Sequence, residues 1–277
     1  MTTAQKVIKY LAIAFAMLLI ASVFSGIVSG VASVVGFLTG YPNEDSVDIT
    51  EHDLSDESIS RLDIDVAATN LTIQPGETLK VYVTGNRVSV RVSGETLRIE
   101  EKSTFFHSTT SCTVNVTLPV SELERADIST GAGTLHIEGL SAKVLDLDLG
   151  AGDTVLKNIN ISDQADIDGG AGKLDIDASE ISELDLDMGV GSVNISAALL
   201  GESEIDCGVG QLKLELTGEK SDYSIDIDKG IGDVKVDGES VRDGAEIGNG
   251  HREVNISSGV GDVEVKFNPP DKTEAIE

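Results

Sequence analysis

The sequence predicts an all-β protein whose main part is a parallel β-solenoid, built from rungs of about 20 residues. A Gly-x-Gly signature occurs seven times, at intervals of 19, 20, 19, 19, 22 and 29 residues. The residues around it alternate between apolar and polar, which is typical of half-buried strands. Aromatic residues make up only 4% of the chain, so the core must be built from Ile, Leu and Val, which suits thin stacked rungs. A rung of this size cannot bury its own hydrophobic face and is stable only when stacked on its neighbours.

The seven copies can be aligned on the first glycine of each signature, which gives Gly131, Gly150, Gly170, Gly189, Gly208, Gly230 and Gly259. Three aligned columns are apolar: the third position before this glycine, the position directly after it and the sixth position after it. We expect them to form aliphatic ladders inside a stack of parallel strands about 4.8 Å apart. The glycines indicate a sharp bend or a close approach of neighbouring backbones. A β-sandwich is the alternative, but its antiparallel neighbours would mirror each other rather than repeat at 19–20 residues.

The N-terminal part is expected to anchor the protein in a membrane. Residues 1–10 carry Lys6 and Lys9 and no acid, and residues 11–38 contain no charged side chain. About 20 apolar residues span a bilayer, so this stretch predicts a transmembrane signal-anchor helix. The two lysines predict a cytoplasmic stub, a single-pass topology and an exterior position for the acidic remainder. The alternative is a signal peptide cleaved after Ala32, although the apolar region of such peptides normally runs about 7–15 residues.

Within the expected span, Gly26 and Gly30 form a GxxxG pattern. Small residues four apart let two helices approach closely, so the pattern is compatible with a homodimer through the transmembrane helix. The alternative is a flexible exit from the membrane.

The next two segments are a linker and a cap. Residues 39–60 are acidic and polar, and we expect a linker there. Residues 61–125 alternate without the glycine signature, which predicts an atypical capping half of the solenoid. Ala67-Ala68-Thr69 stands where later copies have Gly-x-Gly, so the first rung is degenerate. The loop Ser103–Ser111 holds Phe105-Phe106-His107, which would either touch a partner or cover the end of the solenoid.

Residues 126–268 carry the Gly-x-Gly repeats and complete the predicted solenoid, which spans 61–268. Proline cannot donate a ladder hydrogen bond, so Pro269 and Pro270 end strand pairing. Residues 269–277 are then a short polar tail.

Three stretches carry a resemblance to a known family. They are Leu62–Asp65 with Asn70–Ile73, Val114–Pro119, and the Gly-x-Gly rungs themselves. Together they resemble the bacterial putative-adhesin family, a domain of unknown function with β-strand repeats, over about residues 60–267. The resemblance implies a right-handed β-helix displayed outside a bacterial cell membrane, with an N-terminal anchor. It supplies no catalytic or binding residues.

Two acidic columns flank the apolar column that precedes the bend. One contains Asp127, Asp146, Asp166, Asp185, Glu204, Asp226 and Asn255, and the other contains Ser129, Asp148, Asp168, Asp187, Asp206, Asp228 and Ser257. In a stack both would point outward on one face, where neighbouring carboxylates repel by roughly 1 kcal/mol in water. Calcium would relieve this repulsion, whereas a plain solvated face would prevent edge-to-edge aggregation. We assign no metal ligand and no cofactor.

Composition and motifs argue against several function classes. With 48 acidic and 20 basic residues the net charge is −28, which argues against nucleic-acid binding. Cys112 and Cys207 lie 95 residues apart, without metal-binding or disulfide-framework spacing. The Gly-x-Gly copies lack the third glycine and the following helix of a dinucleotide site. Their period also differs from that of the nine-residue calcium-binding repeat.

Catalysis is not expected either. An enzyme site on a β-helix would break the repeat and gather basic, histidine or aromatic residues on one face, whereas His52, His107, His136 and His251 are scattered. The marked departure from the repeat is Val241–Arg252, which accounts for the 29-residue interval and is the best candidate for a local site. We expect a surface loop there and no catalytic residue.

We therefore expect a non-catalytic, membrane-anchored cell-surface solenoid that serves as an adhesion, interaction or scaffold module, with a cell-surface protein or glycan as partner. The alternative is an accessory component of envelope-stress signalling that acts through a membrane partner. A polysaccharide-active β-helix enzyme is a third hypothesis. Replacing Gly26 and Gly30 by Leu separates the first two, because a scaffold tolerates the change and a membrane-coupled regulator does not.

Overall fold

The computed structural model describes residues 49–102, 112–119, 121–242 and 244–269. They belong to one compact unit, Val47–Glu277. The predicted transmembrane helix at 11–38 and the loop at 103–111 lie outside the described residues, as does nearly all of the predicted tail. Within the described part of the chain, no helix is long and apolar enough to cross a membrane.

The described chain is almost entirely β-strand, with one short 3-10 helix, η1 (Lys220–Asp222). The strands are β1 (Ile49–Asp53), β2 (Arg61–Val66), β3 (Thr69–Gly76), β4 (Lys80–Thr84), β5 (Val88–Ser93), β6 (Thr96–Glu101), β7 (Cys112–Pro119), β8 (Glu122–Glu138), β9 (Ser141–Leu199), β10 (Glu202–Thr217), β11 (Tyr223–Ile231), β12 (Val234–Val236), β13 (Glu239–Ser240), β14 (Ile247–Gly248) and β15 (Arg252–Asn268). The predicted all-β class is confirmed.

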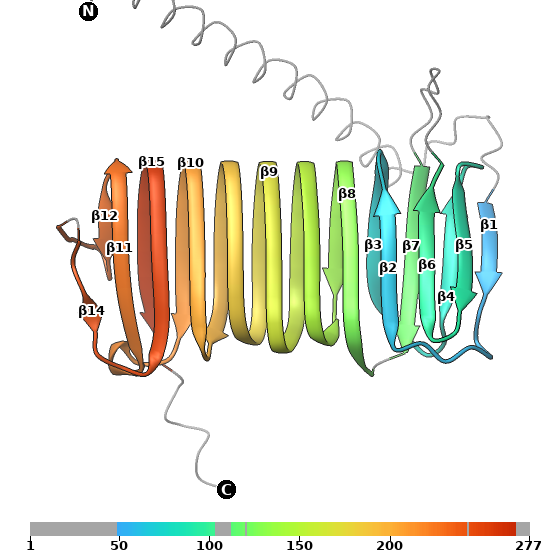
Figure 1. The fold of residues 1–277 in the computed structure, drawn as a ribbon, viewed down its shortest axis with the longest axis horizontal. Helices are drawn as coiled ribbons and strands as arrows, with labels where there is room; N and C mark the ends of the chain where they lie inside the picture. The colour runs from blue at the N-terminus through green and yellow to red at the C-terminus, as the bar shows by residue number, and fades with distance from the viewer. Residues whose placement is uncertain (1–48, 103–111, 120, 243, 270–277) are drawn as a thin grey trace, which may run out of the picture. The chain divides into compact units, whose positions relative to one another are not determined.

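The central strands are wound into stacked rungs that pair in parallel (Figure 1). β8 pairs with the start of β9 so that Gly133 faces Gly152, and the end of β9 pairs with β10 so that Gly191 faces Gly210. The predicted parallel stacking at a period near 20 residues is therefore confirmed. The columns three before and six after the first glycine are buried, as predicted, at positions such as Ile128 and Ile137.

The bends explain why each signature needs its glycines. At Gly210 the backbone has a φ of +153°, and a Cβ would lie 1.6 Å from the carbonyl oxygen of Gly191 in the neighbouring rung. At Gly131, the first glycine of its signature, a Cβ would lie 2.4 Å from the carbonyl oxygen of Ala67. Both interpretations of the glycines, a bend and a close backbone approach, are thus correct.

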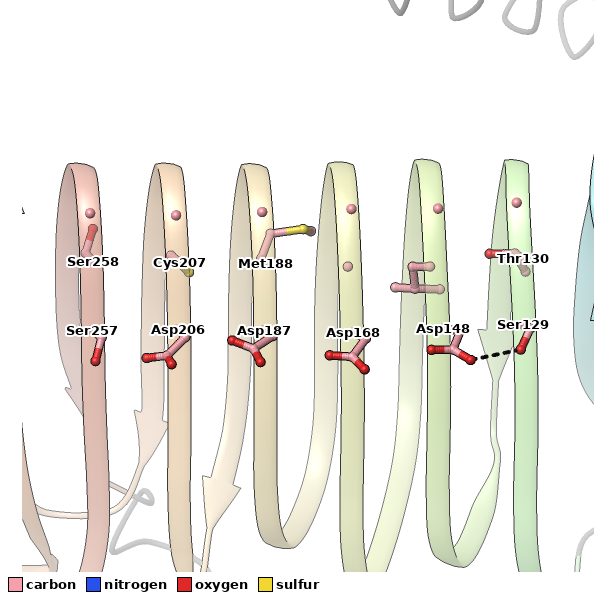
Figure 2. A pocket seen from close by; sticks show the side chains of 18 of the residues that line it. Ser129, Thr130, Asp148, Asp168, Asp187, Met188, Asp206, Cys207, Ser257 and Ser258 are labelled. Atoms are coloured by element: carbon pink, nitrogen blue, oxygen red, sulfur yellow. Dashed lines mark hydrogen bonds between the residues drawn. The ribbon is translucent and has the colours of Figure 1, made fainter.

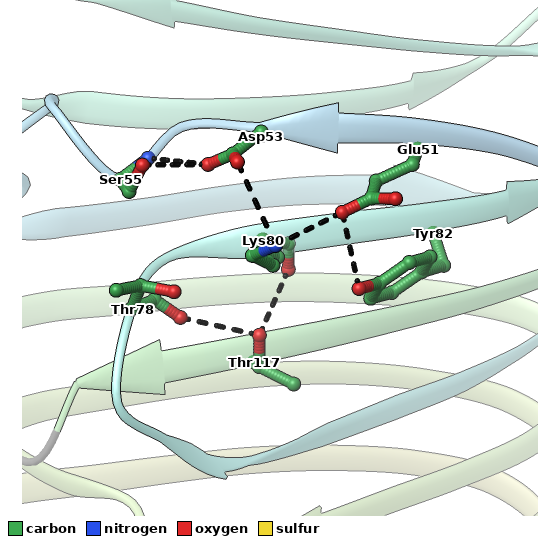
Figure 3. Close-up of polar contacts among 7 residues, drawn as sticks. All are labelled: Glu51, Asp53, Ser55, Thr78, Lys80, Tyr82 and Thr117. Carbon is green, nitrogen blue, oxygen red and sulfur yellow. Dashed lines mark hydrogen bonds and ion pairs between the residues drawn. The ribbon is translucent and has the colours of Figure 1, made fainter.

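The N-terminal end is closed by a rung and a set of antiparallel strands. β2 and β3 form a rung that pairs with β8 on one side and with β6 and β7 on the other. β5 pairs antiparallel with β6, β4 with β7, and β1 with β4. The stretch 39–60, expected to be a linker, therefore contains a strand. Lys80 of β4 holds β1 in place through Glu51 Oε1 at 3.0 Å and Asp53 Oδ2 at 3.6 Å (Figure 3).

At the C-terminal end the rungs are not stacked in the order of the sequence. β15, the last strand, lies between β10 and β11, and pairs in parallel with both (Figure 1). β12 also pairs with β15, so β11 and β12 form the outermost rung. We expected successive copies to pair with each other, and the structure shows that the last two copies exchange places.

This order keeps two aspartates apart. If β11 lay directly on β10 in the same register, Asp228 would face Asp206. The structure instead places Ser257 of β15 between them. β15, which has no acid at this position, thus separates β10 and β11, which carry Asp206 and Asp228 there.

The segment Val241–Arg252, expected to be a surface loop, helps to close this end. It contains β14, which pairs antiparallel with β11, and Ile247 of β14 is only 4% exposed. Arg252 stacks on the ring of Tyr223 at 5.2 Å and donates a hydrogen bond of 3.2 Å to its hydroxyl oxygen. The irregular sequence of this segment is therefore explained by packing.

Candidate functional site

A groove with a volume of about 1240 Å³ runs along the solenoid beside the bends. Each of eight rungs contributes the same three positions, namely the first residue of the bend and the two residues before it. In spatial order the triplets are 65–67, 129–131, 148–150, 168–170, 187–189, 206–208, 257–259 and 228–230. With rungs about 4.8 Å apart, the groove is about 34 Å long.

The middle of the groove floor is apolar. It is formed by Leu149, Met188 and Cys207, which precede the first glycine of their bends, and by the glycines themselves. Gly169 holds the equivalent position between Leu149 and Met188, and a Cβ there would lie 2.6 Å from the sulfur of Met188. The Met188 side chain fills this space, as Figure 2 shows. Cys207 is buried, with 8% of its surface exposed.

One edge of the groove is an acidic row. Figure 2 shows Asp148, Asp168, Asp187 and Asp206 aligned on successive rungs. Ser129 continues the row, and its hydroxyl donates a hydrogen bond of 3.2 Å to Asp148. Among the described residues, no lysine or arginine forms an ion pair with any of these four aspartates. We call these four residues the acidic row.

The electrostatics of this edge are unfavourable to the folded protein. Partial burial and the nearby carboxylates of Asp206, Asp168 and Asp166 raise the pKa of Asp187. Burial, together with the charge of Asp206, raises the pKa of the Cys207 thiol to about 11, so this cysteine is a neutral part of the floor. A positive charge placed in the groove would reduce the repulsion along the row.

The second acidic column lies two residues earlier in each rung and is neutralised at one end. Arg125 donates to Asp127 in its own rung and to Asp146 Oδ2 in the next at 2.6 Å. Burial raises the pKa of Asp146 and Asp166, and nearby carboxylates add to the effect. Both predicted columns therefore exist, but the groove lies beside only one of them.

The opposite arm of the rungs differs in its charge balance. There some acids pair with lysines of their own strands: Glu215 with Lys213 at 2.7 Å, and Glu264 with Lys266 at 2.9 Å. The hydrogen bond from the lysine lowers the pKa of Glu215 and of Glu264. The uncompensated negative charge is thus concentrated on the groove side.

An exposed apolar ridge follows the bends next to the groove. It consists of the residues between the two glycines, which we expected to point inward. Val190, Val209, Val260 and Ile231 are instead 50%, 48%, 45% and 73% exposed. The bend interrupts the period-two alternation, because its second glycine has a positive φ. Counting every second residue through the bend therefore assigns the following side chains to the wrong face. The buried column after the bend begins at positions such as Leu135 and Leu212.

The residue that completes the first rung comes from a distant strand and is not evident from the repeat. Glu101 of β6, whose side chain is 3% exposed, accepts hydrogen bonds from the backbone nitrogens of Ala67 and Ala68 at 2.8 and 2.9 Å. It also pairs with Arg87 at 2.9 Å. Its carboxylate thereby takes the place of a neighbouring backbone at the bend that lacks glycine. No local sequence signal marks this role, because Glu101 lies more than 30 residues away.

The described residues hold no arrangement typical of a metal site. Within residues 49–102, 112–119, 121–242 and 244–269, no three His, Cys, Asp or Glu side chains converge on one point. His136 lies 3.9 Å from Glu138 on the far arm. His107 and the adjacent phenylalanines lie outside the described residues. The groove is therefore the candidate site.

Comparisons with known proteins place the chain in a family. No curated protein matches it. Among solved structures, a putative cell adhesion protein from Clostridium sporogenes is 16% identical, with a TM-score of 0.41, and the match covers 80% of this chain and 100% of that one. A putative adhesin from Bacteroides fragilis is 14% identical (TM-score 0.37; 81% and 98% covered). A putative lipid binding protein from Parabacteroides distasonis is 13% identical (TM-score 0.37; 81% and 98% covered).

The family model described as Toastrack DUF4097 matches residues 59–275, which is most of the chain. This confirms the family expected from the Gly-x-Gly rungs and the strands at its N-terminal end. The protein belongs to the Toastrack DUF4097 family.

Proposed function

We propose that the protein is a non-catalytic interaction module of the bacterial cell surface, which uses its solenoid for adhesion or as a scaffold. The observation that carries the proposal is the groove. Eight rungs contribute equivalent positions to one continuous surface, which suits contact with a long partner. A catalytic centre would need a local group of unlike side chains, and the repeated lining of the groove offers none.

The proposal includes an anchor at the N-terminus. The uncharged stretch 11–38 would span the membrane, with Lys6 and Lys9 on the cytoplasmic side and the solenoid outside. The right-handed winding implied by the family resemblance is part of the same proposal.

The location is tested by labelling intact cells that express the full chain with Ser240→Cys. Ser240 is exposed, whereas Cys112 and Cys207 are buried, so the unsubstituted chain is the control. A membrane-impermeant maleimide is expected to label the variant and not the control. Labelling only after the cells are broken would contradict an exterior position.

The interaction surface is tested by photo-crosslinking in the same cells. A benzophenone side chain at Val209, on the ridge beside the groove, is expected to trap a partner. The same group at Lys157, an exposed position on the far arm, serves as the control. Equal crosslinking at both positions, or none at Val209, would show that the groove side is not an interaction surface.

A further inference from the structure

We propose that the groove binds an extended, basic polypeptide segment, whose lysine or arginine side chains pair with the acidic row while its small apolar side chains rest on the floor. This inference rests on the proposed function, because it names the class of partner that the groove accepts.

Charge is the first argument. The acidic row presents four carboxylates on adjacent rungs, none of them in an ion pair with a described lysine or arginine. Asp65 and Asp228 extend the same edge at its two ends. The cation in the lining, Lys229, lies in the outermost rung and donates to the carbonyl oxygen of Gly232 at 2.6 Å. An acidic partner would be repelled along most of this length, and a basic one attracted.

Shape is the second argument. A peptide of ten residues in an extended conformation is about 33 Å long, close to the groove length of about 34 Å. Alternate side chains of such a peptide point to opposite sides, so basic residues can face the acidic edge while apolar residues face the floor. Same-side residues are about 6.6 Å apart and the carboxylates about 4.8 Å apart, a difference that flexible lysine side chains can bridge.

The chemistry of the lining favours a peptide over a glycan. Sugar rings are usually held by aromatic faces and by planar amide side chains. The lining contains no Trp, Tyr, Phe, Asn or Gln; its floor offers Leu149, Met188 and Cys207 instead. Aliphatic and sulfur-containing side chains adapt to varied apolar groups, which suits peptide side chains.

The test measures binding of the synthetic peptide (Lys-Val)5 to the full chain, purified in a neutral detergent, by calorimetry. Three comparison probes are (Glu-Val)5, (Lys-Ser)5 and a β-1,4-linked glucosamine oligomer. We expect (Lys-Val)5 to bind, (Lys-Ser)5 to bind more weakly because it lacks apolar side chains, and (Glu-Val)5 not to bind. Added salt should weaken the binding of the basic peptides.

A pair of matched double variants locates the site. Asp168→Asn with Asp187→Asn removes two neighbouring acids from the row, and is expected to weaken (Lys-Val)5 binding by about fivefold. The control, Asp163→Asn with Glu183→Gln, removes two exposed acids outside the groove, and affinity should change by less than about twofold. The groove variant removes repulsion between neighbouring carboxylates and should therefore stay folded. A loss of peptide binding in this variant can then not be attributed to unfolding.

The outcomes separate the two proposals. Equal effects of the two double variants, equal binding of (Glu-Val)5, or no binding of (Lys-Val)5 would overturn the peptide assignment. Stronger binding of the glucosamine oligomer, lost in the groove variant, would replace the peptide by a cationic glycan. If crosslinking at Val209 succeeds and the peptide does not bind, the interaction module stands and only the class of partner is wrong. If the peptide binds and no crosslink forms, the groove accepts basic peptides but meets no partner in these cells, and the proposed role as an interaction module fails.

Discussion

The second glycine of each bend combines a positive φ with a close backbone contact, and Gly210 shows both. Its φ is +153°, and the carbonyl oxygen of Gly191 occupies the space of a Cβ. The neighbouring atom belongs to the backbone, so it cannot move without breaking the ladder. The backbone of the neighbouring rung therefore leaves no room for a side chain at this position.

We expect Gly210→Ala to lower the free energy of unfolding by more than about 4 kcal/mol, because strain and a backbone clash act together. Urea unfolding measures the change. Gly94→Ala is the matched control, since Gly94 has a φ of +61° but no atom within 4 Å of its would-be Cβ. That substitution should cost about 1 kcal/mol. Similar losses in both variants would show that φ, and not the close approach, selects glycine at the bend.

Asp187 is a residue at which function and stability conflict. Its raised pKa means that the folded protein binds a proton more readily than the unfolded chain does. The ordinary pKa of this carboxyl group is 3.8. Its contribution to the free energy of unfolding therefore falls as the pH rises from 3.8 through the raised pKa of the folded protein.

We expect Asp187→Asn to raise the melting temperature at pH 7 by about 1–2 °C, after allowance for solvent screening of an exposed carboxylate. The gain should disappear at pH 3, where the aspartate is protonated. Thermal unfolding at the two pH values checks this. A gain that persists at pH 3 would mean that the amide makes a new contact rather than relieving repulsion.

The strand β15 is the element that determines how the C-terminal end is built. On the far arm its Glu264 lies between Lys213 of β10 and Lys235 of β12. Its Lys266 faces Glu215 of β10. On the groove side the neutral Ser257 lies between Asp206 of β10 and Asp228 of β11, so at positions 257 and 264 β15 faces neither neighbour with a like charge.

We expect the exchange Glu264→Lys with Lys266→Glu to lower the free energy of unfolding by about 1–2 kcal/mol. The exchange preserves the net charge and the ion pair between positions 264 and 266. It alters only the charges that face each other between neighbouring rungs. High salt should reduce the loss. Adding Lys213→Glu and Glu215→Lys should restore part of the stability, and a failure to do so would argue against charge as the basis of rung order.

Removal of β15 tests its structural role directly. β15 lies between β10 and β11 in the ladder of the sheet, so deleting residues 252–277 should unpair two rungs and not one. Hydrogen exchange is expected to show loss of protection in 223–236, while protection in β8 and β9 is retained. Protected amides in 223–236 would mean that this rung can dock on β10 despite the facing like charges.

At the scale of the whole molecule, the two arms of the solenoid respond to acid in opposite directions. Asp146, Asp166 and Asp187 have raised pKa values, so their unfavourable contribution is relieved as pH falls toward 3.8. Glu215 and Glu264 have lowered pKa values, so their favourable contribution is lost only as pH falls below 4.5.

We therefore expect stability to increase on acidification from pH 7 and to reach its maximum between about pH 4 and 5. Melting temperatures from pH 3 to 8 at fixed ionic strength provide the measurement. A maximum near pH 7 would show that attractive ion pairs outweigh the repulsion among the aspartates.

The repeat made much of this architecture predictable. The aligned apolar columns, to which Ile128 and Ile137 belong, predicted the fold class, the repeat period and most of the buried core, because one pattern is repeated seven times. The acidic columns also predicted the charged face. The groove was not foreseen, because it depends on where the chain turns, and Val209 shows that alternation cannot be counted through a bend.

Other features depend on contacts between distant residues. The position of β15 is a matter of pairing with two strands distant in the sequence, and each copy alone looks like any other. Glu101 supports the first bend from another strand. The strand β1 is short and acidic, and its pairing is visible only once Lys80 is placed opposite Asp53, where its ammonium also reaches Glu51.

The interior position of β15 also has a mechanical consequence. In a solenoid stacked in sequence order, tension on the chain end would peel off the outermost rung, breaking its hydrogen bonds one at a time. Here tension applied to the C-terminus acts on a rung held by ladders on both sides, to β10 and to β11 with β12. The load is shared by many hydrogen bonds at once. This rung should therefore resist being unravelled from the C-terminal end better than an outermost rung would.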